Sequence, residues 1–259
     1  MTRSVALRVV GSLAFRVACY SVMVWCALYA ESWPSPSAAL PDVLLDRVPY
    51  VAWVDQNNYL VWLVAYVPIA LWLLARDADR FIRYMVTSGV VALARGACIM
   101  VTGLPAISGA HGALSFEQRW SAWLHLTTPL GFFDRDSGAR VALTRDLFFS
   151  GHTATTFLLL LYVWRFPRLR WPMLVAHAVV MACVAFAHLH YAIDVIGAYA
   201  VTFSVYALRE WAPARATPRP DGVGENATRL LPAGASSNPS APDNRLPAAR
   251  SRSARRGRP

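Results

Sequence analysis

Lysine is absent from this chain, and charged residues of any kind are scarce. All 25 basic residues are arginine, which we attribute to the codon usage of a GC-rich bacterium. Only 15% of the residues are charged, 56% are hydrophobic, and the mean hydropathy is +0.36. Soluble domains are about 45–50% apolar and about 25% charged. The composition therefore argues against an ordinary soluble domain. Because the apolar residues are clustered, it favours membrane spans.

Cysteines are few, and none has the spacing of a metal site. The four of them lie singly inside apolar runs, at Cys19, Cys26, Cys98 and Cys183. We expect them to behave as small buried hydrophobic side chains. The sequence thus predicts no metal site and no cofactor.

Six apolar stretches have, or nearly have, the length of about 20 residues that a helix needs to cross a bilayer. They are residues 11–30, 58–75, 84–105, 148–164, 172–189 and 191–208. The first has the alternative of a secretory signal peptide, because Arg3 and Arg8 precede an apolar run that ends in "ALYA". Leu28 stands where cleavage needs a small residue, and Arg16 interrupts the run, so we expect an uncleaved span. The sequence predicts an all-α membrane protein, with a bundle of six transmembrane helices in residues 1–210.

Arginine in short loops indicates which ends of the spans face the cytosol. Segments 76–83 and 165–170 carry three arginines each, whereas the loop 31–57 carries one arginine against four acidic residues. We therefore predict that both termini are cytosolic and that loops 31–57, 106–147 and 188–191 lie outside. In a bacterium the membrane would be the inner one, with these loops in the periplasm.

The last segment, residues 211–259, is rich in Arg, Pro, Ala and Ser and poor in large apolar residues. It holds nine arginines against three acidic residues, which is +6 of the net charge of +10. Such a composition predicts a disordered tail. Binding to nucleic acid is one alternative, but we favour a solvated cytosolic tail near anionic lipid. No feature of the sequence indicates an oligomeric state.

Two polar segments fall at the predicted outer face, although they are far apart in the sequence. "SGHT" (150–153) begins the fourth span, and "HLHYAIDVIGAY" (188–199) turns from the fifth span into the sixth. His190 and Asp194 are four residues apart, so on a helix they share a face and the carboxylate can hold the imidazole by its Nδ1–H. That arrangement leaves Nε2 available as a nucleophile or a base.

The start of the fourth span has the features of a phosphate site. Unpaired N–H groups and the helix dipole favour an anion there. Gly151 allows close approach of a ligand, Ser150 can cap the helix or contact the anion, and His152 can act as a general acid or base. Together with His190 and Asp194, these residues suit phosphoryl transfer through a phosphohistidine. Capping and packing are the alternative roles for the same residues.

The motifs resemble those of the sphingomyelin synthases, within the type 2 phosphatidic acid phosphatase superfamily. The similar segments are "DLFFSGHT" (146–153), "HYAIDVIGAY" (190–199) and "LARGACIMVTGLP" (93–105). The resemblance implies His190 as nucleophile, Asp194 as the residue that orients it, and His152 as acid/base. The motif matches also imply substrate-binding roles, for Ser150, Gly151, Arg95, Asp146 and Tyr191.

The chain departs from this family in places that concern the phosphate. Position 184 is valine where the wider phosphatase family has arginine, and a lysine-led motif is impossible here. Thr144 and Arg145 replace the Cys-Gly of the synthases. These departures favour the synthase branch and leave Arg145 and Arg140 as candidate phosphate ligands.

The resemblance implies an integral-membrane enzyme that moves a phospho-head group from a phospholipid to a lipid alcohol such as ceramide or diacylglycerol. Its partners would be these two lipids and the bilayer. A lipid phosphate phosphatase, in which water attacks the phosphohistidine, is the first alternative. A non-catalytic membrane protein, in which the charged groups form structural pairs, is the second.

Overall fold

The computed structural model describes residues 2–33, 40–107, 114–128 and 143–216, and within them every regular element is an α-helix. The helices are α1 (Arg3–Ala30), α2 (Val43–Arg47), α3 (Ala52–Arg76), α4 (Ala78–Val101), α5 (Phe116–Thr127), α7 (Gly151–Val163), α8 (Pro167–Phe186) and α9 (Ala192–Ala216). The prediction of an all-α protein is confirmed for these residues. The predicted tail, residues 211–259, lies outside the described residues from 217 onward, and α9 continues to Ala216.

Five of these helices are long and apolar enough to cross a membrane, with mean hydropathies of 1.3 to 1.8. They are α1, α3, α4, α8 and α9, and they make this a multi-pass membrane protein. Helix α7 stands where the sequence predicts another span, but it has only 13 residues. At 1.5 Å per residue it is about 20 Å long, less than the roughly 30 Å of a hydrocarbon core. The sixth span therefore stays a prediction.

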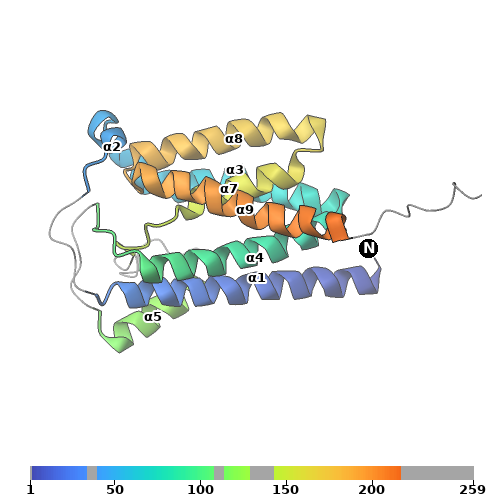
Figure 1. The fold of residues 1–259 in the computed structure, drawn as a ribbon, viewed down its shortest axis with the longest axis horizontal. Helices are drawn as coiled ribbons and strands as arrows, with labels where there is room; N and C mark the ends of the chain where they lie inside the picture. Colours follow the sequence, from blue (N-terminus) through green and yellow to red (C-terminus); the bar gives the residue numbers. More distant parts are fainter. Residues whose placement is uncertain (1, 34–39, 108–113, 129–142, 217–259) are drawn as a thin grey trace, which may run out of the picture. The chain divides into compact units, whose positions relative to one another are not determined.

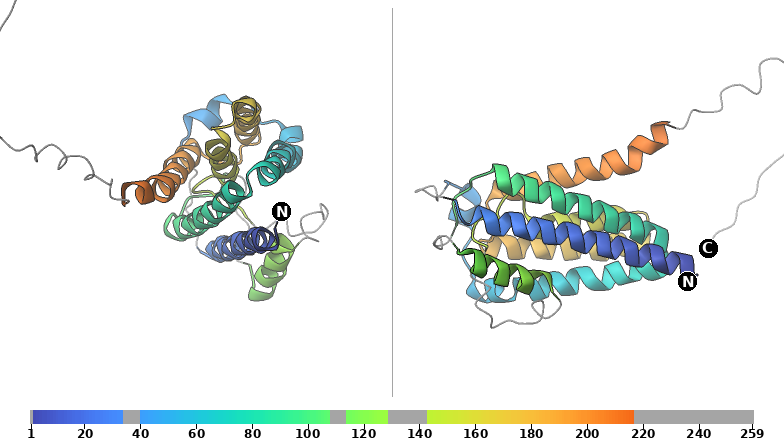
Figure 2. Two further views of the ribbon diagram at one scale, coloured as in Figure 1. Left: turned by 90° about the vertical axis from the view of Figure 1, so that its right-hand side faces the viewer. Right: turned by 90° about the horizontal axis from the view of Figure 1, so that it is seen from below.

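The bundle is built around α4 and α7. Helix α1 runs along α4, and α5 lies against α1 (Figures 1 and 2). Helix α7 packs against α8, α9, α4 and α3. Tyr84, Phe149, Leu158, Leu159 and Met173 are among the fully buried side chains of this core. The short α7 is thus enclosed by longer helices on several sides.

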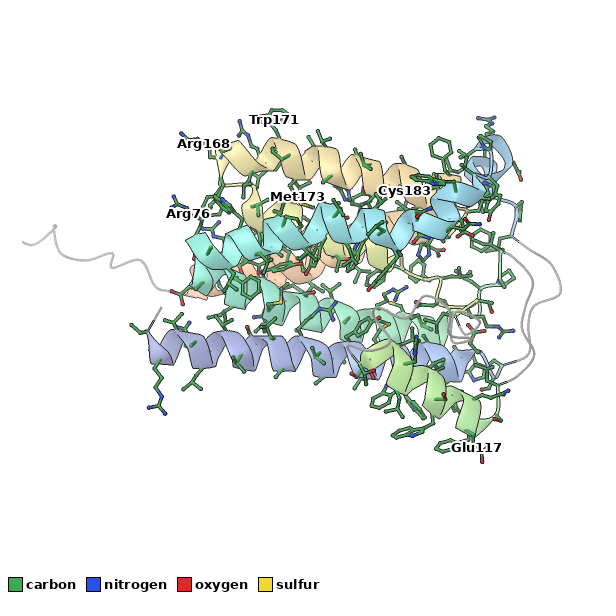
Figure 3. The ribbon with its side chains drawn as sticks, turned by 180° about the vertical axis from the view of Figure 1, so that it is seen from behind. Arg76, Glu117, Arg168, Trp171, Met173 and Cys183 are labelled. Atoms are coloured by element: carbon green, nitrogen blue, oxygen red, sulfur yellow. The ribbon has the colours of Figure 1, made fainter. Side chains whose placement is uncertain are left out.

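The two ends of the bundle differ in their connections. Arg76 and Arg168 lie at the same end as the start of α1, and Glu117 lies at the other end (Figure 3). We call the end that holds Glu117 the loop end; segments 40–51 and 187–191 lie there as well (Figure 1). The assignment of the loop end to the outer face, and of both termini to the cytosol, stays a prediction.

Helix α7 begins inside the bundle rather than at its loop end. Its first residue, Gly151, lies against the guanidinium of Arg95. Arg95 precedes the end of α4 by six residues, which corresponds to about 9 Å of helix. Residues 143–150, which contain no regular helix, therefore lead from the loop end into the bundle. The site residues that follow are recessed below that end.

Candidate functional site

The two polar segments singled out in the sequence meet in the structure. The N–H of Ser150, just before α7, donates to the carbonyl oxygen of Asp194 in the first turn of α9 at 3.1 Å. This backbone contact sets the start of α7 beside the start of α9. The residues that flank each helix start are consequently neighbours.

His190 and Asp194 form a buried pair, but not on a helix face. Nδ1 of His190 lies 3.5 Å from Oδ2 of Asp194, and the two side chains are 6% and 0% exposed. Helix α9 begins only at Ala192, so His190 precedes it. The same Oδ2 accepts the backbone N–H of Tyr191 at 2.9 Å, so the Asp194 carboxylate is turned back toward the segment before the helix. The expected contact is present, but the expected helical geometry is wrong.

The 3.5 Å contact is longer than a good hydrogen bond. Within the described chain, Nδ1 of His190 and Oδ1 of Asp194 are buried without a hydrogen-bond partner. Contacts of this kind are often long in free enzymes and shorten with substrate. Because Asp194 faces Nδ1, the other ring nitrogen of His190 is left for chemistry.

His152 lies in the first turn of α7 and close to this pair. It follows by two residues Ser150, whose N–H donates to the carbonyl oxygen of Asp194. Its ring also lies 6.0 Å from the ring of Trp62 on α3, in an edge-to-face arrangement. His152, His190 and Asp194 are therefore brought together from α7, from the turn before α9 and from α9 itself. Their catalytic roles stay predictions.

Most of the hydrogen-bond donors of Arg95 contact other groups of the protein. Its Nε donates to the carbonyl oxygen of Phe149 at 2.6 Å, and its Nη2 contacts both the carbonyl oxygen and the carboxylate of Asp146, at 3.1 and 2.8 Å. Its Nη1 contacts the sulfur of Met23 at 3.2 Å. Arg95 thus holds the segment that leads into α7, which leaves it little capacity to bind a phosphate directly.

Gly151 and Ser150 also have local structural duties. A Cβ at Gly151 would lie 3.2 Å from Cζ of Arg95, so the glycine permits the close approach of that arginine. Ser150 is the N-cap of α7: its Oγ accepts from the backbone N–H of Thr153 at 3.4 Å and from the Thr153 hydroxyl at 2.9 Å. The N–H groups of Gly151 and His152 make no hydrogen bond to a described residue, and these are the donors left for an anion.

The remaining candidates lie around the site rather than among the histidines. The side chain of Arg145 is directed to the end of α1, where Nη1 lies 3.4 Å from the carbonyl oxygen of Ala30. The hydroxyl of Tyr191 donates to the carbonyl oxygen of Pro105 at 3.1 Å. Arg140 lies outside the described residues. In the described part of the chain, no group of three or more His, Cys, Asp or Glu side chains is placed to hold a metal ion.

Two acidic residues near the site were counted in the sequence only as charges of an outer loop. Glu31 accepts from the Thr144 hydroxyl and from the Arg145 N–H, both at 2.7 Å, and is 4% exposed. Asp42 accepts from the N–H of Ala192, the first residue of α9, at 2.6 Å. Each therefore positions a segment that carries site residues. The sequence signal for this role is weak, because the contacts join positions more than 100 residues apart.

One family of known proteins matches the part of the chain that contains both histidine segments. The family described as PAP2 superfamily C-terminal matches residues 145–211, which include both histidine segments. The match supports the type 2 phosphatidic acid phosphatase superfamily and a lipid phosphatase or phosphotransferase type of function. No curated protein matches the chain. The sphingomyelin synthase branch stays a prediction.

Proposed function

We propose that the protein is an integral-membrane lipid phosphotransferase. It moves a phospho-head group from a phospholipid to a lipid alcohol, such as ceramide or diacylglycerol, through a phosphohistidine. We place the reaction at the periplasmic face of a bacterial inner membrane. The observation that supports this proposal is the buried contact of His190 with Asp194, together with the bond from Ser150 to Asp194 that sets the start of α7, and so His152, beside this pair.

In the first half of the reaction, Nε2 of His190 attacks the phosphorus of the donor lipid. The bond from phosphorus to the diacylglycerol oxygen breaks, and His152 donates a proton to that oxygen. Asp194 holds the Nδ1 side of His190 and stabilises the positive charge that develops on the ring. The products are diacylglycerol and an enzyme that carries the head group on His190.

In the second half, His152 takes the proton of the acceptor hydroxyl, and the acceptor oxygen attacks phosphorus. The bond from phosphorus to Nε2 breaks, and His190 returns to its starting state. The free N–H groups of Gly151 and His152, with the dipole of α7, stabilise the charge on the phosphoryl oxygens in both halves. Among the described residues of the site, these N–H groups have donors to spare, whereas Arg95 is engaged with Asp146 and Phe149.

The chemistry of hydrolysis differs only in the acceptor, so the experiment must vary the acceptor. Purified protein in lipid nanodiscs is given a phospholipid labelled in its head group, with and without ceramide or a diacylglycerol whose acyl chains differ from those of the donor. Labelled lipid product that forms only with an acceptor supports the transferase. Release of free head group or free phosphate at the same rate without an acceptor supports the phosphatase instead.

The variants test the roles of the histidines. His190→Ala should abolish both product formation and a covalent adduct on the protein, detected by mass spectrometry under alkaline conditions, where phosphohistidine survives. His125→Ala, on helix α5, is the matched control and should retain wild-type activity. Retention of the wild-type rate by His190→Ala would contradict the mechanism. Absence of turnover in the wild type with every lipid tried would favour the non-catalytic alternative.

A further inference from the structure

Arg16 is a charged residue near the midpoint of α1, a helix that is otherwise apolar enough to cross a membrane. Its Nε donates to the hydroxyl of Ser88 on α4 at 2.7 Å, and its guanidinium lies 5.4 Å from the centre of the Tyr20 ring. Among the described residues, no carboxylate pairs with it. An ionised side chain at hydrocarbon depth is costly unless it has a partner, so such residues usually serve a function.

Arg16 lies on the same face of α1 as the residue that contacts the site arginine. Positions 16, 20 and 23 follow the helical spacing of one face, and the sulfur of Met23 contacts Nη1 of Arg95 at 3.2 Å. Along the helix, Tyr20 is about 4.5 Å and Arg16 about 10 Å from the level of Met23, in the direction away from the loop end. Arg16 and Tyr20 therefore lie on the Met23 face of α1, farther from the loop end than the contact of Met23 with Arg95.

Contacts with α4 turn this pair toward the bundle. Ser88, which accepts from Arg16, lies on α4 seven residues before Arg95. Seven residues are about two helical turns, so Ser88 and Arg95 share a face of α4. Arg16 and Met23 of α1 thus contact the same face of α4, and Tyr20 lies between them along α1.

The donors of this pair are largely unused by the protein. In the described chain, the two terminal nitrogens of Arg16 and the Tyr20 hydroxyl make no hydrogen bond. Polar groups without partners are strongly disfavoured in a region without bulk water. A ligand for them should carry acceptor oxygens and should reach hydrocarbon depth from the histidine site.

We propose that Arg16 and Tyr20 form a second lipid subsite, which binds the acyl carbonyl oxygens of the lipid whose phosphate lies at His152 and His190. Going from a lipid phosphate toward its chains, the ester or amide carbonyls are the next polar atoms. Guanidinium and phenol groups donate hydrogen bonds, and carbonyl oxygens accept them. The subsite therefore selects acyl lipids over alkyl ether lipids. This inference rests on the proposed function for the place of the phosphate.

The test is a comparison of binding, which needs no turnover. Full-length protein in detergent micelles is titrated with dioleoyl phosphatidic acid and with its dialkyl ether analogue, and binding is followed by native mass spectrometry. Wild-type protein should bind the diester about tenfold more tightly, as expected for hydrogen bonds to a charged group. Arg16→Met should bind both lipids with the affinity of the ether analogue. Arg8→Met is the control, because Arg8 is exposed and pairs with Asp79; it should keep the preference.

Tyr20→Phe serves as a second variant in case Arg16→Met does not fold, since it removes only a hydroxyl, and it should reduce the preference. A further arm compares diacylglycerol with dialkylglycerol. A preference confined to diacylglycerol would mean that the carbonyls belong to the acceptor lipid, which overturns the proposal. Equal binding of both phosphatidic acid analogues by the wild type, or a preference that survives in Arg16→Met and Tyr20→Phe, also overturns it.

These outcomes are separate from those of the proposed function. If the protein shows the Arg16-dependent preference but converts no phospholipid, the subsite is supported and the proposed transferase function is contradicted. If the protein transfers head groups but has no preference for acyl lipids, the transferase function is supported and the subsite is contradicted.

Discussion

Arg95 and Asp146 form an ion pair of 2.8 Å that joins helix α4 to the segment leading into α7. Both side chains are mostly buried, at 8% and 17% exposure. Arg95 also holds the carbonyl oxygen of Phe149, one residue before the N-cap of α7. The position of His152 therefore depends on an arginine whose own donors are turned toward the backbone of this segment. The bonds of Arg95 to Asp146 and Phe149 thus hold in place the segment that leads to His152.

The first prediction follows from the burial of this pair. Arg95→Met leaves the Asp146 carboxylate without its counter-charge, so the free energy of unfolding should fall by about 3–5 kcal/mol. Combining it with Asp146→Asn should cost less than the two single changes added together, by 0.5 kcal/mol or more, roughly. Equilibrium unfolding in mixed micelles measures the unfolding free energy of the wild type, the two single variants and the double variant. Strict additivity would mean that the ion pair contributes nothing.

The second prediction concerns Gly151. In Gly151→Ala the new Cβ would lie 3.2 Å from Cζ of Arg95, and the guanidinium must move. We expect a loss of about 1–3 kcal/mol in unfolding free energy, which is typical of overpacking, and a fall in turnover that exceeds the loss of folded protein. Gly11→Ala is the matched control, because a Cβ at Gly11 meets nothing within 4 Å. That variant should be as stable as the wild type or more so.

The sequence predicts the helices well because their signal is local. Runs of apolar residues mark the five long helices. The recessed start of α7 is not visible in this local signal. The sequence also predicts that His190 and Asp194 lie together, and the distance of 3.5 Å agrees. The sequence attributes this contact to a shared helix face. In the structure α9 starts only at Ala192, and the Asp194 carboxylate turns back to the residues before the helix.

The structural roles that the sequence does not predict depend on contacts between residues far apart in the chain. An acidic residue in an apparent outer loop looks like a solvated charge. Only the packed chain shows that Glu31 accepts hydrogen bonds from Thr144 and Arg145, more than 110 residues away. The internal bonds of Arg95 depend on the path of residues 146–149 in the same way. Such roles have no spacing rule, because helix packing determines them.

The third prediction concerns pH and Glu31. Burial raises the pKa of Glu31 above the ordinary value of a glutamate, although hydrogen bonds from Thr144 and Arg145 partly offset this. A folded-state pKa above the unfolded value means that the folded protein binds more protons between the two values. The contribution of Glu31 to stability is therefore greatest below the unfolded pKa and is lost as pH rises through the folded pKa.

The comparison of wild type with Glu31→Gln measures this contribution, since glutamine does not titrate. The stability of the wild type relative to Glu31→Gln should increase as pH is lowered from 7 toward the ordinary pKa of glutamate. Thermal unfolding across this range checks the direction. A difference between the two proteins that stays constant with pH would show that burial does not perturb Glu31.

The fourth prediction distinguishes the roles of the two histidines by how the activity of each variant depends on the leaving group of the substrate. If His152 protonates the departing alcohol oxygen, His152→Ala should lower the rate about 10²–10⁴-fold with a natural phospholipid. A p-nitrophenyl phosphodiester has a leaving group that needs no protonation, so the same variant should lose far less activity with it. His190→Ala lacks the proposed nucleophile and should be inactive with both substrates. Equal losses of activity for His152→Ala on the two substrates would contradict its role as the acid. Activity of His190→Ala on the activated substrate alone would indicate that His152, or water, attacks phosphorus directly.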